Sequence, residues 1–242
     1  TVASRIDKAT RRIEVRQWDL NHVELTNRWE VINVPATKRR KELAAPLHDH
    51  TGTVVLWEDL DRVLGYKIPW GEYARKNFFK MAEELDLHLG MVFHRFIGGE
   101  AHRRKKLRIA INGTEVEEWD PFAQDEEATI PLPEHQFEVT GNEGQGLVAY
   151  RPFVLPPRDK FSSQNAFNRL AGPRKWNYQQ GFYIYRADRM IQSGGWSYMR
   201  TADEHTKLAR AALEFRPDLD SAFDINVSKE RVNIPATLKD KL

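Results

Sequence analysis

The stretch YARKNFFKMAEELDLHLGMVFHRFIGG, residues 73–99, separates two parts of the sequence that differ in pattern. Its apolar residues recur at spacings of three and four, which places them on one face of a helix. They are Phe78, Ala82, Leu85, Leu89, Phe93 and Phe96. Gly98 and Gly99 follow, and glycine readily adopts the left-handed conformation that ends many helices. We therefore predict one long helix from residue 73 to about residue 96.

The residues before this helix are rich in strand patterns. RRIEVRQWDL (residues 11–20) and NRWEVINV (residues 27–34) place Ile, Val and Trp in near alternation, as half-buried strands do. TGTVVLWEDLDRV (residues 51–63) begins with a Gly-Thr pair and continues as a short apolar run, which is typical of a strand buried on both faces. Residues 35–50 are polar, basic and bracketed by prolines, so we expect a mobile loop there.

Strand and turn signals also follow the helix. In KLRIAINGTEVEEW (residues 106–119), Asn112 and Gly113 supply the positive φ angles of a type I′ turn between two arms. A strand pair is predicted over residues 135–157, with its turn at the glycines of GNEGQG (residues 141–146). These glycines precede a strand pattern, whereas a phosphate-binding loop precedes a helix, so we interpret them as a hairpin turn.

The remaining segments complete an α+β pattern. SSQNAFNRLAG (residues 162–172) predicts a short helix capped by serine, and residues 179–194 predict two strand arms. Residues 202–217 fit a helix by composition and a strand in their second half. FDINVSKERVNIP (residues 223–235) predicts the last strand. The predicted fold class is α+β, with a β-rich part over residues 1–66 and an α+β unit over residues 67–242.

Composition limits the kinds of protein this chain can be. Of its 242 residues, 40% are hydrophobic and 30% are charged, and no apolar run approaches the roughly 18 residues of a membrane span. We therefore expect no membrane partner. With no cysteine, the chain has no disulfide or thiolate metal site, which fits a cytoplasmic location. The first residues, TVASRIDKAT, lack the apolar core of a signal peptide and read as the interior of a longer protein.

Charge is unevenly distributed, although the net charge is only +2. One basic run contains Arg103, Arg104, Lys105 and Lys106, with Arg108 just beyond it, and a second covers residues 38–41. EEWDPFAQDEEA (residues 117–128) is acidic. Such runs are usually solvated, but the first could contact a nucleic acid backbone.

Other residue types suggest weaker candidate sites. His48 and His50 are two residues apart on an extended segment and could ligate zinc, but no third ligand is identifiable, so we predict no metal site. His88 and His94 are six residues apart and share no helix face. The seven tryptophans are scattered, one to each predicted element, as core anchors would be. The aromatic residues of GFYIYR (residues 181–186) could stack on nucleic acid bases.

Several stretches together resemble a known family. HTGTVVLWEDLDRV, HLGMVFHRFI, LRIAINGTEVEEWDPF, QQGFYIYRADRMIQSGGW and FDINVSKERVNIP occur here in that order, between residues 50 and 235. They resemble the downstream part of ATPases of the GHKL superfamily, which includes gyrase B, ninety-kilodalton heat-shock chaperones, histidine kinases, MutL and a MORC-like branch. The resemblance implies the end of a Bergerat-type α/β sandwich over residues 1–66. A transducer domain with a fold like that of the second domain of ribosomal protein S-five would then occupy residues 67–242.

The resemblance also implies roles for three residues. Gly52 and Thr53 stand where the last glycine box of the family meets the nucleotide. INVSKERV (residues 225–232) is similar to a segment of the MutL branch in which a transducer lysine contacts the γ-phosphate of ATP, and Lys229 takes that position. A flexible ammonium group can neutralise charge that develops during phosphoryl transfer. Val227 and Ser228 stand where that branch usually has His-Pro.

The motifs that hold ATP and Mg²⁺ in the superfamily do not occur in these 242 residues. They are the early helix with its catalytic acid and Mg-binding Asn, the Asp-x-Gly-x-Gly box and the glycine-rich lid. We therefore predict that the chain alone binds neither ATP nor Mg²⁺ and has no ATPase activity, and that an upstream ATP-binding segment is its partner. Two alternatives stay open. One is a nucleic-acid-binding segment that uses the basic residues 103–108 on DNA, and the other is a structural or homodimerising segment.

Overall fold

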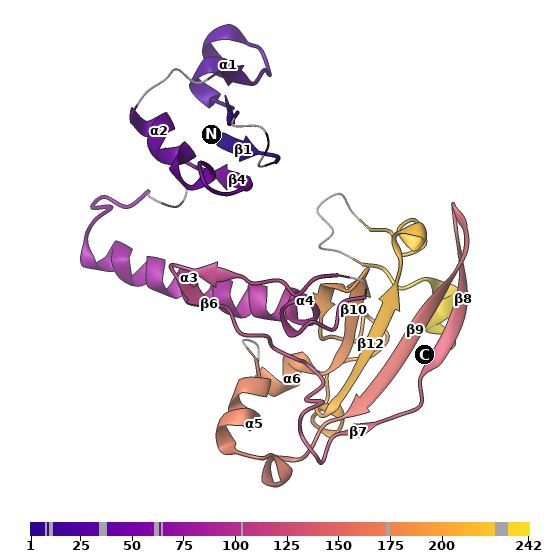
Figure 1. Ribbon diagram of the computed structural model, residues 1–242. Coiled ribbons are helices and arrows are strands. Elements are labelled where there is room, and N and C mark those ends of the chain that lie inside the picture. Colours follow the sequence, from indigo (N-terminus) through magenta and orange to yellow (C-terminus); the bar gives the residue numbers. More distant parts are fainter. Residues whose placement is uncertain are drawn as a thin grey trace. The chain divides into compact units, whose positions relative to one another are not determined.

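The computed structural model describes residues 1–7, 9, 12–33, 38–60, 63, 65–102, 104–172, 175–225 and 232–242. Helices and strands are mixed in an α+β arrangement, as predicted (Figure 1). The chain divides into two compact units, Thr1–Arg75 (unit 1) and Lys76–Leu242 (unit 2). The sequence puts the junction after residue 66, and the division between the units falls in the first turn of the long helix α3 (Glu72–Val92).

Unit 1 is built on a small antiparallel sheet with strand order β3-β2-β1-β4. The strands are β1 (Val2–Arg5), β2 (Glu14–Gln17), β3 (Ile32–Asn33) and β4 (Gly52–Val55). The helices are α1 (Leu20–Thr26), α2 (Lys38–Ala44) and the 3-10 turn η1 (Ala45–Leu47). Ala3 and Val15 on the sheet pack against Leu43 and Leu47, which form the other half of the core. The sequence therefore predicts β2, β3 and β4, but neither β1 nor the helices of this unit.

Two predictions for unit 1 are wrong. Residues 38–47 form helical turns, because Leu43 and Leu47 are four apart and bury themselves against the sheet. The prolines and basic residues suggested a loop there, and residues 34–37 lie outside the described part of the chain. β4 is not a strand buried on both faces. It is an edge strand, and Val55 is 56% exposed.

The long helix is confirmed, with one break. α3 ends at Val92, and α4 (His94–Gly98) continues after Phe93, whose backbone leaves the helical region. Gly99 caps α4 with a φ of 89°, as predicted. The apolar stripe, however, is buried only toward its C-terminal end, since Phe78 and Leu85 are exposed. The type I′ hairpin of β5 (Ala110–Ile111) and β6 (Thr114–Glu115) is also confirmed.

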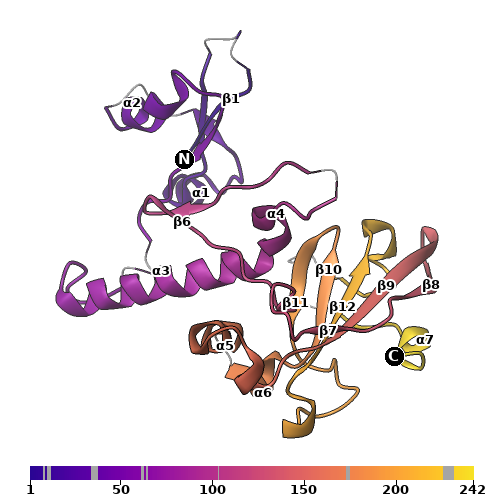
Figure 2. The same cartoon turned by 60° about the horizontal axis from the view of Figure 1, so that its bottom comes forward.

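A six-stranded mixed sheet forms the centre of unit 2 (Figures 1 and 2). Its main order is β11-β10-β12-β9-β7, and β8 also pairs with β9. The strands are β7 (Ile130–Pro131), β8 (His135–Gly141), β9 (Gly144–Val154), β10 (Gly181–Arg186), β11 (Arg189–Ser193) and β12 (Ala209–Phe215). Of the strand pairs that the structure describes, β10 with β12 is the parallel one, and the others are antiparallel. The strand pairs 135–157 and 179–194 are confirmed, and residues 209–215 adopt the strand alternative.

Residues on alternate positions of these strands enter two different cores. Phe182, Ile184, Leu213 and Phe215 face one core, together with the C-terminal helix α7 (Ala236–Lys239). Tyr183 and Tyr185 face the other, with the helix α5 (Gln164–Leu170). The remaining elements of unit 2 are α6 (Lys175–Gln179) and the 3-10 turns η2 (Arg158–Lys160), η3 (Glu204–Thr206) and η4 (Pro217–Leu219), and Leu219 of η4 packs in the first core. Strand alternation thus gives the sheet two buried faces.

The tryptophans do not all act as core anchors. Trp119 is buried, but Trp18, Trp29, Trp57 and Trp70 in unit 1 are between 55% and 86% exposed. Trp18 and Trp29 contact each other, with ring centroids 5.1 Å apart. Unit 1 has a small core, and it leaves these large side chains on its surface.

Candidate functional site

Gly52 and Thr53 lie in the edge strand β4, at its pairing with β1. The Thr53 hydroxyl is 3.0 Å from the Ser4 hydroxyl, and the Ser4 hydroxyl also donates to the Gly52 carbonyl at 3.3 Å. Gly52 has a φ of 149°, which favours glycine, and Thr53 is exposed. Both residues are therefore accessible, and their described hydrogen bonds are those of a strand pair.

Lys229 lies outside the described residues, together with the rest of 226–231, but the chain on both sides of this segment is firmly held. The N–H of Asn233 donates to the carbonyl of Phe223 at 2.9 Å, and its side-chain amide donates to Asp224 at 3.0 Å. Phe223 and Ile234 are both buried. Phe223 lies in a turn after η4 and not in the predicted last strand. The segment that contains Lys229 therefore starts and ends at one fixed place on unit 2.

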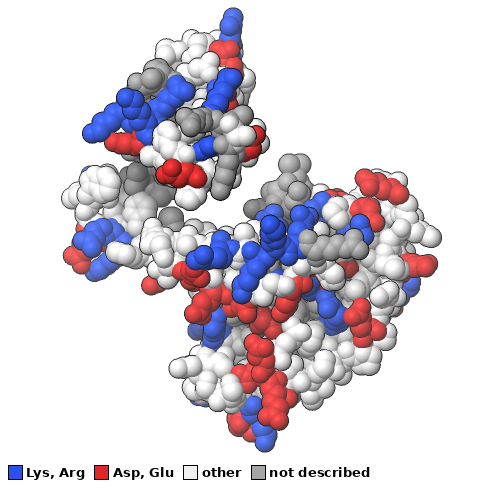
Figure 3. All heavy atoms as spheres, in the orientation of Figure 1, with Lys and Arg blue, Asp and Glu red and all other residues white. Residues whose placement is uncertain are grey.

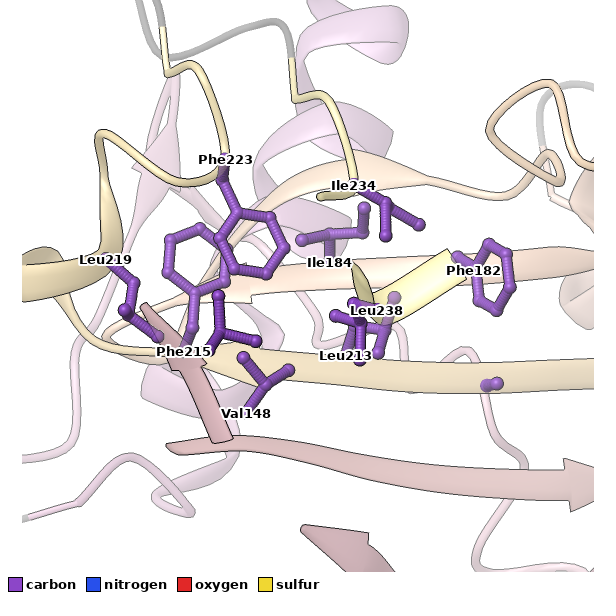
Figure 4. Packing of buried hydrophobic residues seen from close by; sticks show 11 residues of the cluster. Val148, Phe182, Ile184, Leu213, Phe215, Leu219, Phe223, Ile234 and Leu238 are labelled. Carbon is purple, nitrogen blue, oxygen red and sulfur yellow. The ribbon is translucent and has the colours of Figure 1, made fainter. Parts of the chain in front are cut away.

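Phe223 is fixed by stacking on Phe215, the last residue of β12. The two rings are 3.9 Å apart between centroids and 2° from parallel (Figure 4). Leu219 and Ile234 pack in the same core, and neither phenylalanine has more than 1% of its surface exposed. Aromatic pairs of this kind add to the free energy gained from burial alone. The base of segment 226–231 is therefore part of the most buried core in unit 2.

A buried ionic network lies on the opposite face of the same strand. Arg95 of α4 is 3.0 Å from a carboxylate oxygen of Glu214 in β12 and 3.5 Å from one of Asp188 in the β10–β11 turn. Its guanidinium carbon also lies 3.7 Å from the ring centroid of Tyr185. Arg95 is 6% exposed, so these pairs are shielded from solvent. Buried ionic pairs require well-placed partners, and here they join α4 to two elements of the sheet.

Arg151 and His102 extend this network toward the surface. Arg151 in β9 donates to Glu214, and the backbone N–H and the ring of His102 contact Asp188 at 2.9 and 3.3 Å. One ligand atom from each of His102, Asp188 and Glu214 lies within 4.8 Å of the others, a spacing that could hold a metal ion. Two guanidinium groups already contact these same carboxylates, however, and would repel a dication. The arrangement does not fit a metal centre.

The neighbouring His94 is held in its neutral form. Burial, together with the smaller effect of the adjacent Arg95, lowers the pKa of His94 to about 3. Its ring nitrogen Nε2 is 2.9 Å from the Tyr185 hydroxyl, whose pKa is raised well above its ordinary value by burial. A neutral imidazole and a neutral phenol can share one hydrogen bond without a charge. His94 is thus a buried structural residue, and no feature of the sequence alone distinguishes it from the exposed His88.

The basic residues that could contact nucleic acid are exposed where the structure describes them, but they differ in whether they form an ion pair. Arg104, Lys105 and Lys106 lie on the surface between α4 and β5, and Arg103 lies outside the described residues. Arg108 is paired with Glu115 across the β5–β6 hairpin. The N–H of Leu107 donates to Phe96 at 2.9 Å, which fixes the segment against α4. Figure 3 shows Lys and Arg side chains gathered on one face of unit 2 beside a band of Asp and Glu.

The weaker candidates from the sequence do not form sites. Tyr183 and Tyr185 are fully buried and Phe182 nearly so, which makes base stacking on β10 impossible without unfolding. GNEGQG is the turn between β8 and β9, as predicted. His48 and His50 are exposed, and among the described residues they belong to no group of three metal ligands.

Sequence reasoning missed the residues of the ionic network. Arg95 and Glu214 lie in segments whose apolar neighbours are buried, and a charged residue inside such a segment is the signal that could have identified them. Arg95 is 93 residues from Asp188 and 119 residues from Glu214 in the sequence, so only the fold brings these residues together.

Comparison of the chain with protein-family models, with curated proteins and with solved structures gave no match. Among the helices that the structure describes, none combines the length and the apolar character of a membrane span.

Proposed function

We propose that this chain is the downstream part of a GHKL-type ATPase, in which unit 1 ends the ATP-binding domain and unit 2 is the transducer. Its function is to couple ATP binding and hydrolysis in an upstream segment to a conformational change. The five ordered stretches and the α+β character of the chain support this proposal. ATP and Mg²⁺ would be held by the upstream segment. In the described part of the chain, the cluster of His102, Asp188 and Glu214 does not fit Mg²⁺, since its carboxylates contact Arg95 and Arg151.

The observation that carries the proposal is the end of β12. Glu214 and Phe215 are consecutive, so their side chains point to opposite faces of the sheet. Glu214 is bound to Arg95 of the long helical segment, and Phe215 is stacked on Phe223 at the base of segment 226–231. A displacement of α4 therefore acts, through the end of β12, on the base of segment 226–231. Packed elements that move as one body are the means by which local changes become domain movements.

Lys229 is the residue that links this mechanical element to chemistry. In the proposed function its ammonium group contacts the γ-phosphate of ATP and stabilises the charge that develops there. Gly52 and Thr53 contribute an accessible strand start near the nucleotide. Because the contact exists only while the γ-phosphate is present, hydrolysis would release segment 226–231 from it. The firmly held base of this segment then transmits the change to unit 2.

The test is ATP hydrolysis by the chain joined to its upstream segment. We expect the joined protein to hydrolyse ATP and the 242-residue chain alone not to do so. Lys229→Ala should lower kcat by about 10-fold or more while changing nucleotide affinity less, as expected for an interaction made mainly in the transition state. Lys160→Ala, an exposed lysine of unit 2, is the matched control. Equal turnover by the Lys229→Ala variant and the parent would remove Lys229 from the mechanism.

The second candidate function is binding of nucleic acid through the basic segment. The exposure of Arg104, Lys105 and Lys106 on a segment fixed against α4 favours it. Duplex DNA should then bind in a salt-dependent way, and charge reversal at Arg103 and Arg104 should weaken it. Absence of binding at low salt would exclude this function. Sedimentation of the chain tests the remaining alternative, a homodimerising segment.

A further inference from the structure

A hollow of about 580 Å³ lies in unit 2 between α6, the end of α5 and the chain around η3. This volume is within the range of small-molecule sites. It is lined by residues from four segments that are distant in sequence, including Arg158, Phe167, Trp176 and Lys207. None of these residues has a role in the proposed function, so the hollow is a candidate for a separate binding site.

Aromatic rings form much of its wall. Phe167 and Trp176 are stacked, with centroids 4.6 Å apart and an interplanar angle of 25°. Tyr178 is 67% exposed and also lines the hollow, so a large ring faces solvent beside the partly buried pair of Phe167 and Trp176. The indole nitrogen of Trp176 is buried and has no hydrogen-bond partner among the described residues. Because this nitrogen is itself shielded from solvent, it does not open onto the hollow and does not indicate a ligand there.

The charged residues of the wall are predominantly basic. Arg158, Lys175 and Lys207 line it with a single acid, Glu204, so three positive charges oppose one negative charge. Lys207 is paired with Glu204 at 2.9 Å. Arg158 binds the neutral side chain of Gln164, and its guanidinium lies 5.6 Å from the ring centroid of Phe167. The positive charge of Arg158 is thus not neutralised by this hydrogen bond, and it stands beside an aromatic ring.

The backbone at the edge of the hollow is strained. Lys175 has a φ of 61°, in the left-handed region that a long side chain rarely adopts. Such conformations have a free-energy cost and are concentrated at ligand-binding positions. Lys175, the residue with this strained backbone, is one of the basic residues that line the hollow.

We propose that this hollow, which is separate from the ATP site of the proposed function, binds a nucleoside monophosphate, with the base stacked on its aromatic side chains and the phosphate held by Arg158 and Lys175. A planar base matches exposed aromatic faces, and a phosphate matches an arginine and a lysine on one wall. Either source of this chemistry fits: a free mononucleotide, or one nucleotide of a single strand. An apolar ligand would form no ion pair with Arg158 or Lys175, and inorganic phosphate would form no stacking contact with the aromatic rings.

The test is nuclear magnetic resonance titration of the full 242-residue chain with AMP, adenosine, ribose 5-phosphate and an oligo(dT) strand. The indole signal of Trp176 is assigned with the conservative variant Trp176→Phe. We expect AMP to shift this signal, and adenosine and ribose 5-phosphate to bind more weakly than AMP. Tighter binding of oligo(dT) than of AMP, with a steep dependence on salt, would identify a single strand as the source. Equal or weaker binding would identify the free nucleotide.

Two pairs of variants separate the site from general effects. Arg158→Gln with Lys175→Gln should weaken AMP binding about 10-fold or more, and Lys160→Gln, a nearby exposed lysine outside the wall, should leave it unchanged. Tyr178→Ala should weaken binding about fivefold or more through lost stacking, whereas Tyr198→Ala, another exposed tyrosine, should not. Failure of both AMP and oligo(dT) to shift the Trp176 signal would overturn the proposal. Binding that is insensitive both to the Arg158→Gln, Lys175→Gln variant and to Tyr178→Ala would overturn it as well.

Discussion

Glu214 and Phe215 are neighbours in β12, yet they hold two different parts of unit 2. Glu214 forms an ion pair with Arg95 at 3.0 Å on one face of the sheet, and the ring of Phe215 stacks on that of Phe223, with centroids 3.9 Å apart, on the other. A strand alternates its side chains between two faces, and both faces of this one are buried. The end of β12 is thus where the helical segment α3–α4 and the base of segment 226–231 are both attached.

Removal of the Phe223 ring should be strongly destabilising. Phe223→Ala leaves a cavity against Phe215, and we expect unit 2 to lose about 3–5 kcal/mol of its free energy of unfolding. Phe223→Leu retains most of the volume and should cost less than about 2 kcal/mol. Urea denaturation followed by circular dichroism measures both. A loss below about 1 kcal/mol for Phe223→Ala would show that the stacked pair does not hold this part of the chain.

Breaking the ionic network at Arg95 should also be costly. Arg95→Ala leaves Asp188 and Glu214 with fewer partners in a shielded environment, so we expect a loss of about 3–5 kcal/mol. Arg108→Ala is the matched control, because it removes an arginine from the exposed pair with Glu115 and should cost less than about 1 kcal/mol. Similar losses for the two variants in the same denaturation assay would contradict the structural role of Arg95.

His94 should make stability depend on pH. Its pKa is about 3 in the folded chain and near 6.5 in the unfolded chain, so only the unfolded chain binds a proton between these values. The contribution of neutral His94 is therefore fully present above pH 6.5 and is lost as the pH falls toward 3. In this window stability should decrease by up to about 1.4 kcal/mol per pH unit.

The comparison that isolates this effect uses His94→Gln, in which the pH slope between 6 and 4.5 should be smaller than in the parent. His88→Gln changes an exposed histidine of α3 and should leave the slope as it is. If the slopes of the parent and of the His94→Gln variant were the same, the buried histidine would not be the source of the pH dependence.

Local signals in the sequence predict much of unit 2. The predicted turn at Asn112-Gly113 and the predicted cap at Gly99 both have positive φ angles. Both depend on a few adjacent residues and on the backbone conformations that these residues can adopt. The residue types at these positions are therefore enough to identify them. The helix α2 shows the opposite case, because its formation depends on burial of Leu43 and Leu47 against a sheet that is distant in sequence.

The candidate site is less predictable for the same reason. Arg95, Asp188 and Glu214 are ordinary charged residues in the sequence, and their interaction exists only because α4, the β10–β11 turn and β12 meet. The hollow beside Trp176 likewise combines residues from four separate segments. The family resemblance predicts a role for Lys229. The contacts that hold both ends of its segment, made by Phe223 and Asn233, are found only in the folded structure.

The proposed function makes a further prediction about Asn233. Its side-chain amide donates to Asp224 at 3.0 Å and closes the base of segment 226–231. In the chain joined to its upstream segment, Asn233→Ala should lower kcat for ATP hydrolysis, since a looser base positions Lys229 less accurately. In a Lys229→Ala background the same change should have almost no effect, because the group that it positions is gone. Asn168→Ala removes another exposed hydrogen bond between side chains, that with Gln164, and should not alter kcat in either background. Equal losses from Asn233→Ala with and without Lys229 would mean that Asn233 acts through general stability and not through the lysine.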